Sequence, residues 1–420
     1  MSFITSAPGK VIIFGEHSAV YNEPAVAASV SSLRSYLLVE AIEGSDSIVL
    51  NFPDIGFHQE WKHSEFDPIL NNAEYSSLLE SARKDTKNLD ETLVRLLEDS
   101  LLSSLKETLH YHAALCFLYL YVCMCPDVKG IDFSVKSTLP IGAGLGSSAS
   151  ISVVLALAMA KLGGAIKVID GLSVDDKKLI NTWSFIGEKC IHGTPSGIDN
   201  AVATYGNAVL FKREEDGSTN FEFIQDFPQI PMILSHTKIP RSTKTLVGNV
   251  RALLDTYPAI IQPIISSMGS LATEGANILN NLDESNYSDL LELVRINHGQ
   301  LVSLGVSHPS LETIKSLSDS MDIGSTKLTG AGGGGCSLSI LKKDIKREQI
   351  DEFKKTLESQ HNFGTYETDL GGMGCSAAFL ENFSEDDIKE ITEIFGKKDV
   401  TRKQIDDLFL SKNSKLSWIY

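Results

Sequence analysis

The feature that most constrains this chain is a glycine-rich loop leading into a long apolar helix, within the stretch 136–164, KSTLPIGAGLGSSASISVVLALAMAKLGG. A strand-like segment, IDFSVKSTLP, precedes the loop, and Gly142, Gly144 and Gly146 occupy alternate positions in it. Glycine lets the backbone turn tightly and leaves no Cβ in the way of a ligand. The segment from Ala149 to Leu162 consists of good helix formers, and its stretch ISVVLALAMA is apolar on all sides, which predicts a buried and rigid helix.

The start of that helix is a candidate anion site. Its first N–H groups have no partner within the helix, and the positive end of the helix dipole lies there. Ser147 or Ser148 is expected at the N-cap. No lysine follows Gly146 as in a P-loop, and a serine at position 147 breaks the dinucleotide pattern Gly-x-Gly-x-x-Gly. We interpret the loop as a third kind of polyphosphate cradle, with a plain connector as the alternative.

Composition restricts the partners. The 420 residues carry 37 Lys and Arg against 54 Asp and Glu, a net charge of −17. So acidic a chain is a poor candidate for binding nucleic acid or an anionic membrane. Phosphate groups would have to be held by local dipoles, a few cations and Mg²⁺.

Strand-like and helix-like segments alternate along the chain, which indicates an α/β or α+β architecture with room for two domains. Composition becomes polar and turn-rich after Phe211, and we predict domains at 1–225 and 226–420. Residues 61–90 are expected to be an irregular surface excursion, 93–124 a long helical region, and the C-terminal part a single last helix after a strand near Tyr366.

Cysteine usage and hydropathy predict a cytoplasmic protein. The six cysteines form no C-x-x-C pair, so buried free thiols are expected. No signal peptide is expected, because Pro8 and Gly9 precede any long apolar run. The run from Ala113 to Cys125 is too short to span a bilayer and is predicted to be a core helix.

Two further stretches carry candidate functional residues. Lys10 precedes a short predicted strand, Val11 to Phe14, and Glu16 and His17 follow it; a surface lysine and a structural histidine are the alternatives. In the second stretch, a helix is expected to reach Glu188. Asp199 then lies in the first turn of the next helix, where the dipole favours a carboxylate.

The second half of the chain adds a basic cluster and another glycine loop. Lys238, Arg241 and Lys244 either meet an acidic substrate or are solvated loop residues. The run Gly330–Gly335 satisfies Gly-x-Gly-x-x-Gly, but the following CSLSILKK is strand-like rather than helical, so a dinucleotide site is not expected.

Three motifs in this order, APGKVIIFGEH, PIGAGLGSSAS and KLTGAGGGGC, resemble the GHMP kinase superfamily. Within it, GEHSAVY, GEKCIHGTPSGIDNAVATYG and IPRSTK resemble the fungal form of the branch that phosphorylates mevalonate. The resemblance covers essentially the whole chain. It implies an α+β fold, with an N-terminal domain like ribosomal protein S5, including a left-handed β-α-β unit, and a C-terminal ferredoxin-like domain.

The activity that the resemblance implies is ATP-dependent phosphorylation of the 5-hydroxyl of mevalonate to 5-phosphomevalonate, in isoprenoid and sterol biosynthesis. It implies catalytic roles for Asp199 as general base and Lys10 beside it, and Mg²⁺ binding by Ser148 and Glu188. The implied nucleotide-binding residues are Lys10, Ser137, Gly142, Ala143, Gly144, Leu145, Gly146, Ser147 and Ser148. The implied mevalonate-binding residues are Glu16, His17, Thr243 and Ala331. Asp54 stands where relatives carry an asparagine near the nucleotide.

Two other functions remain open. One is a related kinase for galactose, homoserine or phosphomevalonate, and the other is a nucleotide-binding regulator without catalysis. The residues do not decide whether Asp199 or Lys10 dominates activation of the hydroxyl. The resemblance also implies a homodimer and feedback inhibition by isoprenoid diphosphates.

Overall fold

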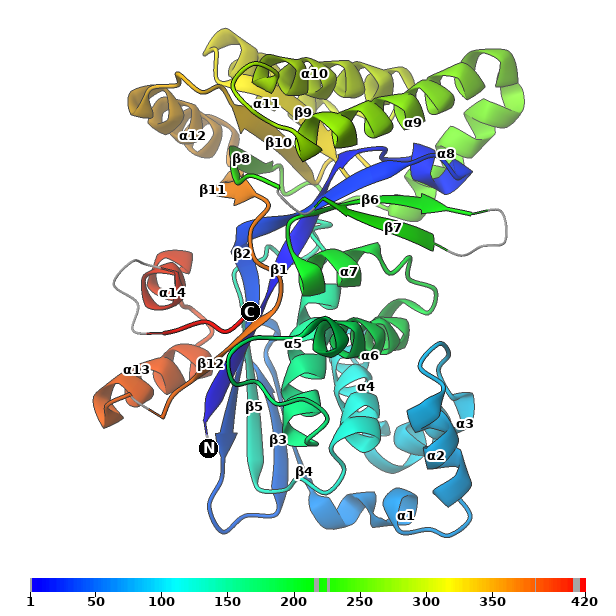
Figure 1. Cartoon of the computed structure of the whole chain (residues 1–420), viewed down its shortest axis with the longest axis vertical. Helices are drawn as coiled ribbons and strands as arrows, with labels where there is room; N and C mark the ends of the chain where they lie inside the picture. Colours follow the sequence, from blue (N-terminus) through cyan, green and yellow to red (C-terminus); the bar gives the residue numbers. More distant parts are fainter. Residues whose placement is uncertain (1, 215–218, 225–226, 382, 411–415) are drawn as a thin grey trace.

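A computed structural model describes residues 2–214, 219–224, 227–381, 383–410 and 416–420. A single sheet runs through the length of the molecule and joins its two halves (Figure 1). Its strand order is β4-β3-β5-β2-β11-β8-β10-β9, with β1 and β6 also paired to β2, β12 to β1 and β7 to β6. The strands are β1 (Phe3–Phe14), β2 (Ala25–Ala41), β3 (Ser47–Phe52), β4 (Phe57–Lys62), β5 (Ile131–Ser137), β6 (Ala208–Arg213), β7 (Thr219–Ile224), β8 (Ile230–His236), β9 (Gly324–Thr329), β10 (Cys336–Leu341), β11 (Gly364–Leu370) and β12 (Ser376–Phe379).

The 17-residue strand β2 belongs to both halves. Its first part pairs with β6, its last part pairs with β5, and between them Val30 pairs with Leu370 of β11. Opposite β1 the register jumps from Pro8–Arg34 to Gly9–Val30, so residues 31–33 are left unpaired with that strand. Such a bulge bends a strand and increases its twist. The bend lets one continuous strand serve two packed layers.

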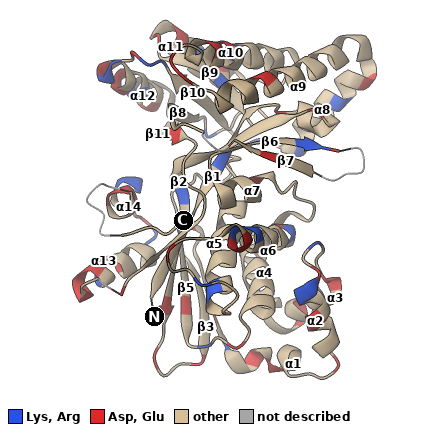
Figure 2. Ribbon diagram, in the orientation of Figure 1, with Lys and Arg blue, Asp and Glu red and all other residues tan. Residues whose placement is uncertain are grey.

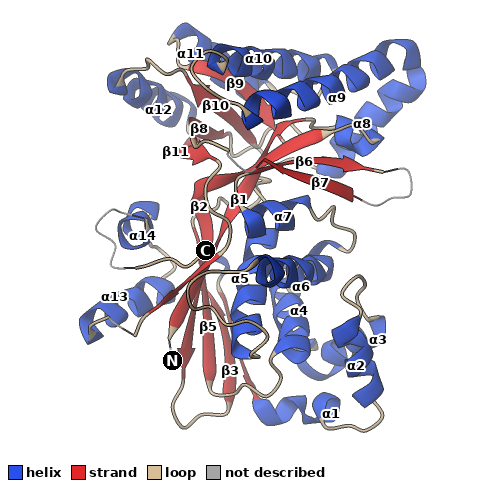
Figure 3. Cartoon of the chain, viewed as in Figure 1, coloured by secondary structure: helices blue, strands red, loops and turns tan. Residues whose placement is uncertain are grey.

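In the first half, helices cover one face of the sheet (Figure 3). The helices are α1 (Asp67–Leu70), α2 (Ser76–Lys84), α3 (Glu91–Leu97), α4 (Thr108–Met124), α5 (Ser147–Leu162), α6 (Val174–His192) and α7 (Ile198–Tyr205). Helix α5 packs against β1, β2, α4 and α6, so its apolar residues are buried on every side, as predicted. The run Ala113–Cys125 lies in and just after α4 and is largely buried, also as predicted.

In the second half, β8 to β11 form an antiparallel layer with the order β11-β8-β10-β9. Counted along the chain this order is 4-1-3-2, with helices after the first and third strands, which is the β-α-β-β-α-β arrangement of a ferredoxin-like domain. The helices are α8 (Thr243–Thr256), α9 (Pro258–Asn280), α10 (Tyr287–Ser303), α11 (Pro309–Ser320) and α12 (Arg347–His361). The predicted α+β class is therefore confirmed.

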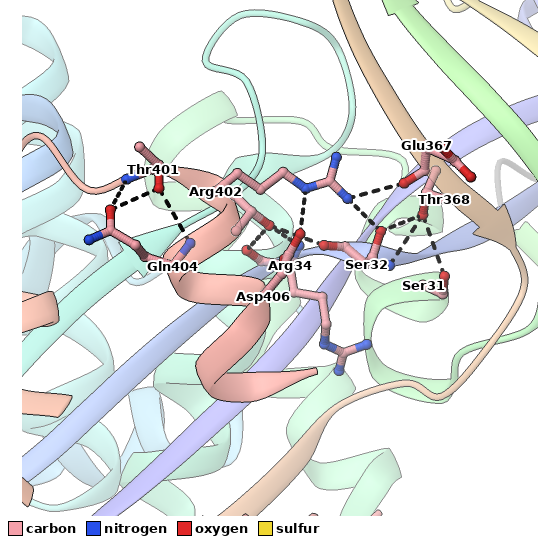
Figure 4. Close-up of polar contacts among 10 residues, drawn as sticks. Ser31, Ser32, Arg34, Glu367, Thr368, Thr401, Arg402, Gln404 and Asp406 are labelled. Carbon is pink, nitrogen blue, oxygen red and sulfur yellow. Dashed lines mark hydrogen bonds and ion pairs between the residues drawn. The ribbon is translucent and has the colours of Figure 1, made fainter. Parts of the chain in front are cut away.

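The C-terminal segment returns to the first half. Strand β12 pairs with β1, and helices α13 (Glu385–Gly396) and α14 (Arg402–Phe409) pack on Ile4, Tyr36 and Leu38, on the face away from α5 (Figure 1). Arg402 of α14 donates to Ser32 Oγ at 2.7 Å, at the bulge of β2 (Figure 4). The predicted boundary between residues 225 and 226 lies outside the described residues, and the division into 1–225 and 226–420 stays a prediction.

Several predicted elements differ from the structure. Strand β1 begins at Phe3, well before Val11, because Phe3–Ser6 pair with β12, whose residues are distant in sequence. The stretch 61–90 is not irregular, since it contains α1 and α2 and buries Trp61 and Phe66. The single last helix is in fact α13 and α14. The region 93–124 is interrupted by a π-helical turn at Glu98–Leu102.

The distribution of charged residues and the state of the cysteines can be compared with the sequence-based predictions. Acidic and basic residues are scattered over both halves (Figure 2). All six cysteines are buried and free, as predicted. Among the described residues, no helix combines the length and the apolar character needed to cross a bilayer.

Candidate active site

The glycine loop delivers an open helix N-terminus. Gly142, Gly144 and Gly146 all have positive φ, 73°, 78° and 70°, which glycine adopts without strain. Gly146 is the N-cap of α5 and no side chain caps the helix, so the prediction of Ser147 or Ser148 at the N-cap is wrong. The hydroxyl of Ser148 bonds Glu188 instead. The first N–H groups of α5 have no side-chain cap, which suits an anionic ligand.

Lys10 and Asp199 meet beside this loop. Lys10 Nζ lies 3.2 Å from Asp199 Oδ1, and the Lys10 N–H donates to Leu145 O at 2.8 Å. A Cβ added to Gly146 would lie 3.2 Å from Asp199 Oδ2 and would crowd the carboxylate, at a position whose φ of 70° already favours glycine. Lys10 is 9% exposed, which excludes the surface-lysine alternative. Asp199 is in the first turn of α7, as predicted.

Ser148 and Glu188 form the second polar pair. Ser148 Oγ donates to Glu188 Oε1 at 2.8 Å, and His192 Nε2 lies 3.2 Å from the same hydroxyl. Glu188 is buried in α6 and does not lie on a solvated face of that helix. Burial raises the pKa of Glu188 to about 7; the hydrogen bond from Ser148 opposes this shift and the charge of Asp199 adds to it. Glu188 Oε2 is buried and has no hydrogen-bond partner among the residues that the structure describes, an arrangement that fits a bound cation.

Glu16 and His17 connect this region to the second glycine loop. Lys327 of β9 donates to Glu16 Oε1, and both side chains are fully buried. His17 Nε2 lies 2.9 Å from Ala331 O, while burial lowers the pKa of His17. The structure therefore brings Glu16, His17 and Ala331 together, although they come from opposite ends of the chain.

Two predicted binding residues, Thr243 and Ser137, lie outside the group of contacts described above. Thr243 is the first residue of α8 and is exposed. Ser137 ends β5, and its N–H donates to Asp54 Oδ2 at 2.9 Å. The Asp54 carboxylate is thus occupied by the protein itself, and also forms an ion pair with Lys136.

Arg241, which was assigned no role beyond the basic cluster, bridges the two glycine loops. Its Nη2 donates to Ala143 O at 2.9 Å and its Nη1 to Gly334 O at 3.3 Å. Cβ atoms added at Gly144 or Gly335 would lie 2.0 Å and 1.9 Å from the guanidinium. The basic cluster in the sequence indicated that Arg241 could bind something negatively charged. Its partners are instead backbone carbonyls, which only the fold brings together.

We expect Arg241→Lys to reduce kcat/KM about 10- to 100-fold, because a single ammonium cannot reproduce the fork that reaches both loops. Steady-state kinetics with both substrates would measure the loss. Lys244→Arg, which also exchanges one cation for another but at an exposed position of α8, serves as the charge-matched control and should be nearly silent. An Arg241→Lys variant with unchanged kinetics would contradict a bridging role.

Lys136 is a buried cation that joins the first half to α13. It is 1% exposed, and its Nζ donates to Asp54 Oδ1 and to Lys397 O, just past the C-terminus of α13. We expect Lys136→Met to lower the free energy of unfolding by roughly 3–5 kcal/mol, because it leaves the Asp54 carboxylate without its partner. Denaturant titration would measure this. Lys136→Met combined with Asp54→Asn should recover part of the loss, and equal loss in both variants would contradict the pairing argument.

Comparison with known proteins defines the class. A family model for the GHMP kinases N terminal domain matches residues 108–207, and one for the GHMP kinases C terminal matches residues 278–359. The first match includes the glycine loop, Ser148, Glu188 and Asp199. The fold and the arrangement around α5 are thus those of a GHMP kinase.

Relatives narrow this class. The chain is 56% identical to a mevalonate kinase of Saccharomyces cerevisiae, covering 100% of this chain and 99% of the relative. A mevalonate kinase structure from Methanococcus jannaschii is similar in fold, with a TM-score of 0.63 at 22% identity over 87% of this chain and 98% of that one. An L. major mevalonate kinase in complex with R-mevalonate has a TM-score of 0.60 at 20% identity, covering 88% of this chain and 96% of that one. The chain belongs to the mevalonate kinase family.

Proposed function

We propose that this protein transfers the γ-phosphoryl group of ATP to the 5-hydroxyl of mevalonate, giving 5-phosphomevalonate and ADP. The observation that carries the proposal is the Lys10–Asp199 pair beside the uncapped N-terminus of α5, in a chain 56% identical to a fungal mevalonate kinase along its whole length. Phosphoryl transfer needs positioning and charge stabilisation more than covalent chemistry from the protein. The arrangement offers both.

The nucleotide is proposed to bind along residues 142–148. The N–H groups at the start of α5 would donate to phosphate oxygens, and Lys10 adds a cation at the same place. Ser137 lies at the end of β5, the strand that leads into this loop, and its proposed nucleotide contact rests on the family pattern. Arg241 holds the loop against residues 330–335.

Ser148 and Glu188 are proposed to hold Mg²⁺. One hydroxyl and one carboxylate, with phosphate oxygens and water, form a donor set that this hard cation prefers. The ion would neutralise charge that develops on the phosphate oxygens. The remaining ligands of the ion are proposed to come from the nucleotide phosphates and water.

Asp199 is proposed as the general base. The alcohol oxygen forms a bond to the γ-phosphorus while the bond from that phosphorus to the β–γ bridging oxygen breaks, and ADP keeps the electron pair. Asp199 accepts the hydroxyl proton, and Lys10 stabilises the negative charge that develops on the alcohol oxygen. Glu16, His17, Thr243 and Ala331 are proposed to contact mevalonate.

An ADP-release assay tests the function. The purified chain is given Mg²⁺-ATP with mevalonate, phosphomevalonate, galactose or homoserine in separate reactions. We expect turnover on mevalonate alone. Turnover on another alcohol would leave the kinase chemistry and overturn the acceptor, whereas nucleotide binding without any turnover would favour a regulator.

The family pattern also carries proposals on assembly and control. We propose a homodimer, which light scattering of the purified chain would test. We further propose inhibition by isoprenoid diphosphates, because a diphosphate suits the same N–H groups of α5; competition with ATP in the kinetics is the expected result.

A cytoplasmic location is supported by the six free, buried cysteines.

A further inference from the structure

Lys327 is a fully buried cation that the mechanism above does not use. It lies in β9 of the second half, with 0% of its side chain exposed, and donates to Glu16 Oε1, which is itself 1% exposed. Lysine is almost never buried completely unless it is paired. Removing both charges from water costs free energy that the attraction within the ion pair rarely offsets. A contribution to stability therefore does not explain why this pair is buried.

Neighbouring contacts repeat the same connection. Thr329 Oγ1 donates to Ile12 O at 2.9 Å, and Ala331 O lies 2.9 Å from His17 Nε2. Together with Lys327, alternate positions of β9 and its following loop therefore hold the segment from β1 to His17. Lys327 and Thr329 are alternate residues of β9, so their side chains point to the same face of the strand, and the loop after β9 adds the backbone carbonyl of Ala331.

The segment keeps unfilled hydrogen-bonding positions. Glu16 Oε2 and His17 Nδ1 are both buried, and neither has a hydrogen-bond partner from another residue of the described chain. A buried polar atom without a partner costs free energy unless a ligand or water satisfies it. Glu16 is within electrostatic reach of Lys10, which pairs with Asp199. The free oxygen is therefore part of the same charged region as the Lys10–Asp199 pair.

We propose that Lys327 is a positioning residue that holds Glu16 by one carboxylate oxygen and leaves the other to accept a hydrogen bond from a hydroxyl of the acceptor. This inference rests on the proposed kinase function. Burial raises the pKa of Glu16, and the Lys327 charge opposes that shift, so the lysine also favours the ionised form of the carboxylate. An ionised carboxylate accepts hydrogen bonds at both oxygens, whereas a protonated carboxyl offers one fewer acceptor.

A double-mutant cycle tests the proposal. Glu16→Gln, Lys327→Met and the double variant are compared with the parent for KM of the acceptor, KM of ATP and kcat. We expect Lys327→Met to raise the acceptor KM about 10- to 100-fold with little change in the KM of ATP, because a hydrogen bond to a charged group is lost. Since the lysine acts through Glu16, adding Lys327→Met to the Glu16→Gln variant should change the acceptor KM less than twofold.

The pH profile separates positioning from a general structural effect. Two charged or titratable groups face this pair. Lys10 acts on Glu16, and His298 lies near Lys327. His298 in turn pairs with Glu312. Without Lys327 the pKa of Glu16 rises further, so the carboxylate forms only at higher pH. We expect the acceptor KM of Lys327→Met to fall as pH is raised from 6 to 9, and this fall to be absent in the double variant.

The outcomes are distinct. The parent is first assayed on the acceptor panel, and failure there on mevalonate overturns the proposed function; the cycle then uses whichever alcohol is phosphorylated. The positioning role would be overturned if Lys327→Met raised the KM of the acceptor and the KM of ATP equally. It would also be overturned if the effects of the two substitutions on the acceptor KM were additive in the double variant. Lys327→Met leaves a buried carboxylate unpaired, which can prevent folding, but the double variant has no such carboxylate. If Lys327→Met does not fold, the acceptor KM of Glu16→Gln is compared with that of the double variant, and a change of twofold or more overturns the positioning role. Lys342→Met, which removes an ion pair with the exposed Asp322 in the same half, is the control and should leave all constants unchanged.

Discussion

Asp199→Ala is expected to lower kcat by about 10²- to 10⁴-fold, the range of a lost general base, while ATP binding stays nearly intact. The carboxylate is at the start of α7 and contacts Lys10, so its removal takes away the proton acceptor without disturbing the loop 142–148. The asparagine variant keeps the shape of the side chain and should be nearly as slow. Stopped-flow single turnovers with ATP in excess would measure the chemical step.

The control for this prediction is nucleotide binding measured by calorimetry on both variants. Lys10 loses its partner in each, but Asp199 is 32% exposed, so solvent replaces much of the lost contact. A kcat within a few-fold of the parent for Asp199→Ala would remove the base assignment. Activation of the hydroxyl would then fall to Lys10.

Lys10→Met should also lower kcat strongly, by about 10²- to 10³-fold, because a preorganised cation beside the forming charge is lost. The effect on folding should be smaller. The pair is partly exposed, and such ion pairs contribute about 1 kcal/mol or less. Thermal unfolding beside steady-state kinetics would separate the two effects.

Lys10→Arg provides the matched variant, since it keeps the charge but changes the position of the donors. We expect it to recover only part of the rate. If Lys10→Met were as active as the parent, the lysine would have no role in transfer, despite its contacts with Leu145 and Asp199. If it lost stability and rate in proportion, its role would be structural.

Local signals predicted much of the site correctly. The alternate glycines and the apolar run after them predicted a tight loop and a buried helix, because backbone freedom and burial depend on residue type alone. Glu188 was expected in a helix, and Asp199 in the first turn of the following one; both lie there. The second glycine run was expected to precede a strand, and β10 begins at Cys336.

Other features could not be predicted, since they depend on contacts between distant segments. Strand β1 gains residues 3–6 from pairing with β12, 370 or more positions away. Trp61 and Phe66 are buried under α4, although their surroundings in the sequence are polar. The N-cap of α5 is Gly146, and the hydroxyl of Ser148 is directed to a carboxylate from another helix.

The sequence by itself determined which residue types carry the chemistry and the local elements on which they lie. Only the tertiary structure decided which of them meet: Lys10 with Asp199, Lys327 with Glu16, and Arg241 with the carbonyls of two loops. The physical reason is that propensity and periodicity act over a few residues. A buried charge, in contrast, takes its partner from whichever segment the sheet places beside it, here up to 311 positions away.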